Sequence, residues 1–280
     1  MSVWFTEEDG QGRRYGFAIE DVLFSGQSAY QKVEVFQTKH WGRLLAVDGF
    51  VMLTERDEFV YHEMISHPAV CMHQSPEEVV VIGGGDGGTL RELVKHDAVK
   101  HITLCEIDQM VIDASLEFLP GVASAFEHDK VTVKVGDGIA YMNELENHAD
   151  LILVDSADPI GPGEGLFTDV FYRSVAKALK PDGLMVAQTD SVWMNQVQQQ
   201  KVYGQISSAF REVKPMQGVV PTYPNAHWTW TMAANRPLDL SQLDLSRLAA
   251  VEKDLQYLNQ DMLKAVFALP TFYRRQLGLS

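Results

Sequence analysis

The sequence predicts an α/β protein in which a small antiparallel β-domain precedes a mostly parallel sheet with helices on both faces. Three features lead to this class: short alternating runs in residues 1–55, uniformly apolar runs of strand length that alternate with helical periods after residue 55, and a glycine-rich loop behind the first apolar run. Uniformly apolar strands separated by helices are typical of a parallel sheet buried on both faces. We therefore expect two domains, at 1–55 and 56–280.

The first domain is predicted from a hairpin signal. Residues 33–36 alternate in polarity, and residues 43–47 run into Asp48 and Gly49, which are followed by the apolar stretch 50–53. Asp-Gly between two apolar runs strongly favours a two-residue β-turn. Residues 1–55 are therefore expected to form antiparallel strands.

The second domain is predicted from a change of period. Apolar residues from 57 to 73 recur at helical spacing, and strands and helices alternate from there on. The expected strands are 78–82, 101–105, 131–135, 151–154, 184–187 and 228–233. The expected helices are 57–73, 90–96, 110–118, 139–147, 170–179, 196–210 and a single C-terminal helix from about 246 to 267.

The composition disfavours several classes of protein. The 280 residues carry a formal net charge of −15, which makes nucleic acid and anionic membranes poor partners. Cys71 and Cys105 are the only cysteines and lie in apolar runs, so we expect no disulfide framework and a reducing, cytoplasmic location. The N-terminal residues lack the apolar segment of a secretory signal, and no apolar run is long enough to cross a membrane.

A glycine-rich loop and an acid mark the first two strand ends, where parallel sheets bind their ligands. Residues 83–88 read Gly-Gly-Gly-Asp-Gly-Gly, which satisfies G-x-G-x-x-G between a strand and a helix. Asp86 in this loop would repel a pyrophosphate, which disfavours a dinucleotide; the alternative is that Asp86 only caps the next helix. Glu106 follows the second strand. Its spacing along the sequence from the glycine-rich loop is that expected for an acid that binds ribose hydroxyls, so adenosine binding is indicated.

The third and fourth strand ends are also acidic. Asp137 and Gly138 suit an amino group that approaches the backbone, such as the adenine amine, although a plain turn is nearly as well supported by this dipeptide. Asp155 and Asp158 leave an apolar strand and enter a Pro/Gly-rich loop. An unpaired charge at a mostly buried strand end costs several kcal/mol, so this loop is expected to bind a cation, either a metal or an amine.

An amine is favoured over a metal. His62 and His67 are five residues apart, whereas a helix needs a spacing of four to bring two histidines onto one ion. For His62 alone, a packed or solvated role is as well supported as a ligand role.

Asp190 ends the fifth strand, and Tyr223 lies between two prolines in a later loop. Aromatic rings beside carboxylates are the usual way to hold an alkylammonium ion.

Taken together, these motifs resemble the spermidine synthase (polyamine aminopropyltransferase) family over residues 5–235. The segments that carry the resemblance are 27–31, 45–49, 57–63, 83–88, 106–108, 155–162 and 221–224. The resemblance implies an N-terminal β-domain followed by a methyltransferase-like Rossmann fold, assembled as a homodimer or homotetramer. It implies transfer of an aminopropyl group from decarboxylated S-adenosylmethionine, the co-substrate, to putrescine, which gives spermidine and methylthioadenosine. No prosthetic group and no metal are implied.

The resemblance also implies roles for single residues. Asp155 is the expected proton acceptor, and Asp86 is expected to bind the aminopropyl ammonium of the donor. The residues expected to hold the rest of the donor are Gln31, Glu106, Asp137, Gly138 and Pro162. The residues expected along the polyamine channel are Tyr61, His62, Asp86, Asp155, Asp158, Asp190 and Tyr223. The chain has Asp190 where the family often has glutamate, which leaves the preferred length of the acceptor open.

Four other functions stay open. The acceptor of the same reaction can be agmatine, cadaverine or spermidine, since one methylene changes binding by only about 1–3 kcal/mol. An S-adenosylmethionine methyltransferase would have to bind the donor's carboxylate beside Asp86, and a NAD-linked dehydrogenase would place pyrophosphate there. Both are therefore disfavoured on charge. The presence of Asp155 and Asp158 argues against the interpretation that the chain is a non-catalytic polyamine-binding protein.

Overall fold

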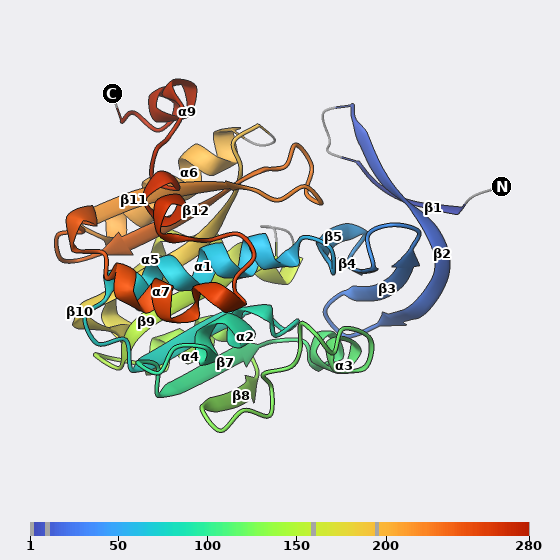
Figure 1. Ribbon diagram of the computed structural model, residues 1–280, viewed down its shortest axis with the longest axis horizontal. Helices are drawn as coiled ribbons and strands as arrows, with labels where there is room; N and C mark the ends of the chain where they lie inside the picture. The colour runs from blue at the N-terminus through green and yellow to red at the C-terminus, as the bar shows by residue number, and fades with distance from the viewer. Residues whose placement is uncertain (1–2, 9–11, 158–160, 194–195, 280) are drawn as a thin grey trace.

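The computed structural model describes residues 3–8, 12–157, 161–193 and 196–279. They form two sheets, a five-stranded one and a seven-stranded one, which lie side by side in Figure 1. The change from the first sheet to the second falls between β5 and α1. The predicted α/β class, with an antiparallel sheet ahead of a mostly parallel one, is confirmed.

The N-terminal sheet is antiparallel throughout, in the order β1-β2-β3-β4-β5. Its strands are β1 Val3–Glu8, β2 Arg14–Gln27, β3 Lys32–Thr38, β4 Arg43–Val47 and β5 Phe50–Thr54. The predicted hairpin joins β4 to β5, with Val47 paired to Phe50. Asp48 and Gly49 both have positive φ angles, 50° and 84°, as a type I′ turn requires.

The larger sheet has the order β11-β12-β10-β9-β6-β7-β8. Its strands are β6 Glu78–Gly83, β7 His101–Glu106, β8 Val131–Val135, β9 Ala149–Asp155, β10 Leu179–Ser191, β11 Glu212–Val219 and β12 His227–Ala234. Strands β6 to β10 pair in parallel, and β12 runs antiparallel to both β10 and β11. Strand β11 was not predicted, and it contains Pro215, which is tolerated because β11 is an edge strand.

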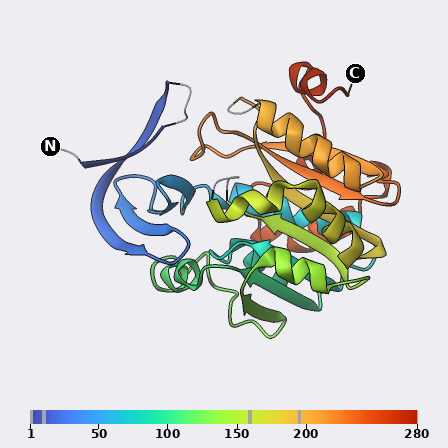
Figure 2. The ribbon, with the colours of Figure 1, turned by 180° about the vertical axis from the view of Figure 1, so that it is seen from behind.

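Helices cover both faces of the larger sheet. The first six are α1 Glu58–Met72, α2 Gly88–Val94, α3 Gln109–Phe118, α4 Gly138–Glu144, α5 Asp169–Ala178 and α6 Gln196–Ala209. Residues of α1 and α2 share one hydrophobic core with the sheet, and residues of α4, α5 and α6 share the other. Figure 2 shows the second layer from behind. None of the described helices combines the length and apolar character that crossing a bilayer requires.

The single C-terminal helix predicted over 246–267 is wrong. The chain there forms α7 Leu245–Val251, a 3-10 turn η3 Glu252–Asp254 and α8 Gln260–Ala265, followed by α9 Thr271–Gln276. Between η3 and α8, three successive backbone N–H groups leave the helical pattern and donate to the buried carboxylate of Glu63 on α1. Asn259 then starts α8 by accepting two backbone hydrogen bonds.

The N-terminal sheet docks on α3, beside the carboxyl ends of the parallel strands (Figure 1). Val33, Leu45 and Leu53 of this sheet share a small hydrophobic core with Val111 and Ala114 of α3. This contact brings residues of the first sheet opposite the loops that follow β6, β7 and β9.

Candidate active site

Two adjoining cavities lie between the N-terminal sheet and the carboxyl ends of the parallel strands. Their cavity volumes are about 140 and 300 Å³. Both cavities are lined by Met52, Tyr61, Ser156, Ala157 and Tyr223, so they share a wall. We refer to the one that contains the glycine-rich loop as the first cavity and to the other as the second.

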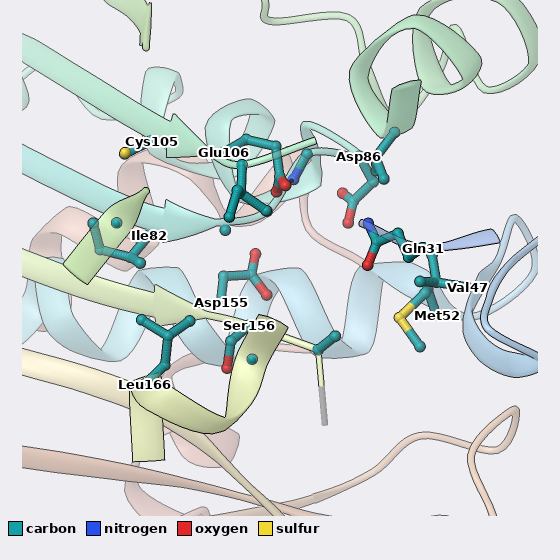
Figure 3. A pocket seen from close by; sticks show the side chains of 18 of the residues that line it. Gln31, Val47, Met52, Ile82, Asp86, Cys105, Glu106, Asp155, Ser156 and Leu166 are labelled. Atoms are coloured by element: carbon teal, nitrogen blue, oxygen red, sulfur yellow. Dashed lines mark hydrogen bonds between the residues drawn. The ribbon is translucent and has the colours of Figure 1, made fainter. Parts of the chain in front are cut away.

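The glycine-rich loop brings β6 against the end of β9. Gly83 and Gly84 have positive φ angles of 81° and 72°, and the Gly84 amide donates to the Asp155 carbonyl at 2.8 Å. A Cβ on Gly84 would lie 2.8 Å from Oδ2 of Asp155. Glycine is therefore needed here so that the loop can lie against the side chain of Asp155, which Figure 3 shows in the first cavity.

Asp155 is the last residue of β9 and is 8% exposed. The Tyr61 hydroxyl donates to Oδ1 at 2.7 Å, and the Thr89 hydroxyl donates to Oδ2 at 2.6 Å. Burial and the charge of Asp86 raise the pKa of Asp155, while these hydrogen bonds act in the opposite direction. A raised pKa makes Asp155 a stronger base than an exposed aspartate.

Asp86 also lines the first cavity (Figure 3), but its pKa is shifted in the opposite direction to that of Asp155. Its Oδ1 accepts from the Gly88 amide at 2.7 Å and lies 3.1 Å from Nε2 of His62. Burial acts to raise the pKa of Asp86, but the charge and hydrogen bond of His62 outweigh it and lower that pKa. The Gly88 contact is the cap considered from the sequence, and Asp86 lines the cavity as well.

Glu106 ends β7 beside the same loop. Its carboxylate accepts from the Gly85 amide at 3.2 Å and from the Asp108 amide at 2.9 Å. Burial raises the pKa of Glu106 to about 7. Gln31 reaches this region because Ser28, in the same turn, donates to Asp108 at 2.7 Å. The N-terminal sheet is thus tied to the start of α3 by a polar contact as well as by its hydrophobic core.

Asp137 and Gly138 line the far end of the first cavity. Asp137 is exposed and caps α4 by accepting from the Ile139 amide at 2.8 Å. A Cβ on Gly138 would lie 2.6 Å from Cγ2 of Ile82, so a larger residue would disturb the cavity wall. Apolar side chains also line the first cavity: Leu45, Val47, Ile82, Val111, Ile139 and Leu166.

Aromatic side chains form one side of the second cavity. The Tyr61 and Tyr223 rings meet edge to face at 6.0 Å, and Tyr223 lies 4.5 Å from Trp228. The Tyr223 hydroxyl donates to the Met52 carbonyl at 2.7 Å, which fixes the ring between the two sheets. Asp190 lines the same cavity with a φ of 66°, a conformation more accessible to aspartate than to most residues.

Glu7 and Glu8 of β1 also line the second cavity, and sequence reasoning missed them. Glu7 is only 8% exposed and accepts from the Val51 amide at 2.8 Å. The sequence carries a weak signal for this position, because alternation along β1 puts Glu7 on the same face as Phe5. It carries none for the docking that brings this face to the cavity.

The described lining of the two cavities is strongly acidic. Seven carboxylate side chains line them, those of Glu7, Glu8, Asp86, Glu106, Asp137, Asp155 and Asp190, and no lysine, arginine or histidine does. The three remaining predicted residues are placed differently. His62 lies behind Asp86, outside the lining. Asp158 and the side chain of Pro162 lie outside the described residues. The surface therefore suits a ligand with several positive charges.

Comparison with known proteins gives concordant matches. The family model "Spermine/spermidine synthase domain" matches residues 58–242, and the model "Spermidine synthase tetramerisation domain" matches residues 3–55. A polyamine aminopropyltransferase of Bacillus cytotoxicus is 42% identical over 97% of this chain and 98% of its own. One from Caldicellulosiruptor bescii is 41% identical over 97% of each chain.

Two solved structures share the whole fold. The crystal structure of a spermidine synthase in complex with the transition-state analogue AdoDATO superposes with a TM-score of 0.96 at 36% identity. The match covers 99% of this chain and 96% of that one. The spermidine synthase of Thermotoga maritima gives a TM-score of 0.93 at 35% identity, covering 99% and 95% of the two chains.

Proposed function

The chain belongs to the spermine/spermidine synthase family, and on that premise we propose that it transfers the aminopropyl group of decarboxylated S-adenosylmethionine to putrescine. The products are spermidine and methylthioadenosine. The observation that carries the proposal is the pair of adjoining acidic cavities that meet at Tyr61 and Tyr223, with Asp155 lining the first beside their shared wall. Two cationic substrates need two sites with a common boundary, and a base where the bond forms.

The first cavity is assigned to the donor. Glu106, at the end of β7, accepts hydrogen bonds from the ribose hydroxyls. The residues around the rest of the nucleoside are Gln31, Asp137, Gly138 and Pro162. Asp86 takes the aminopropyl ammonium. This assignment is supported by the lowered pKa of Asp86, which keeps its carboxylate charged. An unmodified S-adenosylmethionine would bring its own carboxylate against this charge.

The second cavity is assigned to the acceptor. Tyr61, Tyr223 and Trp228 supply apolar and π surface for the methylenes and the nearer ammonium group. Asp190 and Glu7 supply negative charge for the more distant ammonium. Asp158 belongs to this channel by resemblance, and His62 contributes indirectly by contacting Asp86.

The chemistry proposed is a direct displacement. A neutral acceptor nitrogen attacks the carbon next to sulfur, the new C–N bond forms as the C–S bond breaks, and the bonding pair stays on sulfur. The donor's sulfonium becomes a neutral thioether, so the leaving group needs no acid. Asp155 accepts the proton that the nitrogen loses, and its raised pKa favours this transfer. Holding nitrogen, carbon and sulfur in line supplies much of the remaining rate enhancement.

A homodimeric or homotetrameric assembly and a cytoplasmic location are part of the proposal. The match of residues 3–55 to a tetramerisation domain supports an oligomer, as do the exposed apolar side chains of Val3, Trp4 and Val22 on the N-terminal sheet. The location is supported by Cys71 and Cys105, both buried and both free thiols. A reducing compartment preserves such thiols.

An amine panel with product masses tests the function. We expect putrescine, incubated with decarboxylated S-adenosylmethionine, to give spermidine faster than cadaverine, agmatine or spermidine gives its product. Asp155→Asn is expected to abolish turnover while methylthioadenosine still binds, and Asp129→Asn, at an exposed site, is the control. Near-normal turnover by Asp155→Asn would show that the base is misassigned. Absence of product with every amine would remove the enzymatic proposal.

A further inference from the structure

A row of alternating charges continues from Asp86 into the space between α1 and α2. His62 Nε2 lies 3.1 Å from Asp86 Oδ1, and His62 Nδ1 lies 2.6 Å from Glu58 Oε2. Arg91 then donates to both oxygens of Glu58, each at 2.8 Å. The order from the cavity inward is therefore carboxylate, imidazole, carboxylate and guanidinium.

This row is buried and joins two helices to the loop. His62 and Glu58 are 2% and 7% exposed, and they lie one turn apart on α1, where side chains four residues apart face each other. Arg91 belongs to α2. Removing one member of a buried row of this kind leaves its neighbour's charge uncompensated, so the members depend on one another.

Glycine at position 88 makes room for the row. A Cβ on Gly88 would lie 2.3–2.5 Å from three atoms of the His62 ring, far inside van der Waals contact. The φ angle of Gly88 is not positive, so the requirement comes from space alone. The last glycine of the glycine-rich loop thus admits the imidazole beneath the start of α2.

The geometry also fixes the protonation of His62. Each ring nitrogen faces a carboxylate oxygen, which is an acceptor only, so both nitrogens must carry a hydrogen to form these contacts. Burial acts to lower the pKa of His62, but the charges and hydrogen bonds of Asp86 and Glu58 raise it to about 10. His62 is therefore an imidazolium that directs one N–H to Asp86.

We propose that Glu58 and Arg91 are positioning residues that act through His62 to hold Asp86 ionised and correctly oriented before the donor binds. The inference rests on the proposed function, in which Asp86 binds the aminopropyl ammonium. Two donors, His62 Nε2–H and the Gly88 amide, converge on Oδ1 of Asp86 and set the plane of its carboxylate. The row thereby favours a donor with a terminal ammonium and no carboxylate.

Glu58→Gln tests this role, because glutamine keeps the shape and removes the charge. We expect the pKa of His62, followed by NMR of labelled histidine, to fall by about 1–3 pH units. At a pH between the lowered and the wild-type pKa of His62, where the variant imidazole has lost its second proton, we expect decarboxylated S-adenosylmethionine to bind about tenfold more weakly, while methylthioadenosine, which has no ammonium, binds within about twofold of the wild type. Glu117→Gln, an exposed change on α3, is the control and should alter neither quantity.

Two further variants separate positioning from a purely structural role. Gly88→Ala is expected to displace the imidazole and to reproduce the loss of donor selectivity. Arg91→Lys keeps the charge but not the two-point contact with Glu58. It should therefore lower the pKa of His62 and the affinity for the decarboxylated donor, each by less than Glu58→Gln does. Arg91→Lys also tests the inference if the Glu58→Gln variant does not fold. Equal weakening of both ligands, or an unchanged His62 pKa with unchanged selectivity, would overturn the inference.

The failure of the proposed function gives a different result. If Asp86→Asn leaves the preference of the protein for the decarboxylated donor over methylthioadenosine intact, the ammonium role of Asp86 is wrong whatever Glu58→Gln does. If Asp86→Asn removes that preference and Glu58→Gln does not, only the role of Glu58 and Arg91 fails.

Discussion

Thr89→Val is expected to move the onset of activity to higher pH. Thr89 is fully buried, lies outside the lining of both cavities and donates to Oδ2 of Asp155 at 2.6 Å. A donor to a carboxylate stabilises its ionised form. Valine has nearly the same shape without the hydroxyl, so the substitution raises the pKa of Asp155 beyond the rise that burial and Asp86 already cause.

The size of the shift follows from one charge-assisted hydrogen bond. Such a bond contributes about 1.5–3 kcal/mol, and each pH unit corresponds to about 1.36 kcal/mol. The acid limb of kcat/KM should therefore move up by about 1–2 pH units. In its proposed role as the base, Asp155 must be deprotonated. Thr89→Val should therefore lose activity at pH values below the shifted acid limb and recover it above, where substrate contacts are unchanged.

The assay is kcat/KM for putrescine at saturating donor, measured over the pH range in which both proteins stay folded. The ammonium of putrescine titrates identically with every variant and cancels in the comparison. Thr89→Ser retains a hydroxyl and is the matched control, expected to follow the wild type. Coincident profiles for Thr89→Val and the wild type would refute the reasoning, and so would an equal shift for Thr89→Ser.

Three further changes probe binding and stability. Asp86→Asn should weaken the binding of decarboxylated S-adenosylmethionine, measured by calorimetry, about tenfold, and should leave the affinity for methylthioadenosine within about twofold of the wild type. Equal losses of affinity for the two ligands would reject the ammonium contact. Glu7→Gln should raise KM for putrescine several-fold and leave KM for the donor unchanged, with exposed Glu20→Gln as control; an unchanged KM would remove Glu7 from the acceptor site. Glu63→Gln weakens three hydrogen bonds to the segment before α8, so urea denaturation should show that the free energy of unfolding falls by about 1–3 kcal/mol. An unchanged denaturation midpoint would show that the contact is unimportant.

Local pattern predicted most of the larger sheet because its central strands are apolar on both faces. Strands β6 and β9 read as continuous apolar runs, and every residue of β9 is buried. Strand β11 lacks that signal, since an edge strand tolerates Pro215 and polar residues. The C-terminal helix was overpredicted for a different reason. Helical periodicity is local, whereas the competing acceptor, Glu63, lies nearly two hundred residues earlier in the chain.

The acids of the site were predicted because parallel strands end at one edge of the sheet. Glu106 and Asp155 end such strands and Asp86 and Asp137 follow them, so their proximity follows from the fold class. Their placement at the cavity follows from topology; their proposed roles come from the resemblance. Glu7 could not be predicted, since its place depends on how the N-terminal sheet docks on α3.

His62 shows what local reasoning leaves open at this site. The sequence supports a ligand and a packed residue about equally, and the structure gives it contacts that fit neither description fully. Its ring is buried and lines no described part of the cavities, yet Nε2 contacts Asp86. That contact requires the absence of a Cβ at Gly88 and a carboxylate at Glu58, two conditions set by tertiary packing.

The position of His62 decides how charge is divided among three neighbouring acids. Asp86, Glu106 and Asp155 surround one small space, and burial alone acts to raise the pKa of each. Only Asp86 contacts the imidazolium directly, so its pKa falls, and its charge then helps to raise the pKa values of the other two. Neighbouring carboxyl groups whose pKa values move apart can take different tasks. On this argument the cation next to Asp86 supports the two proposed roles, Asp86 as the anion that binds the donor and Asp155 as the base.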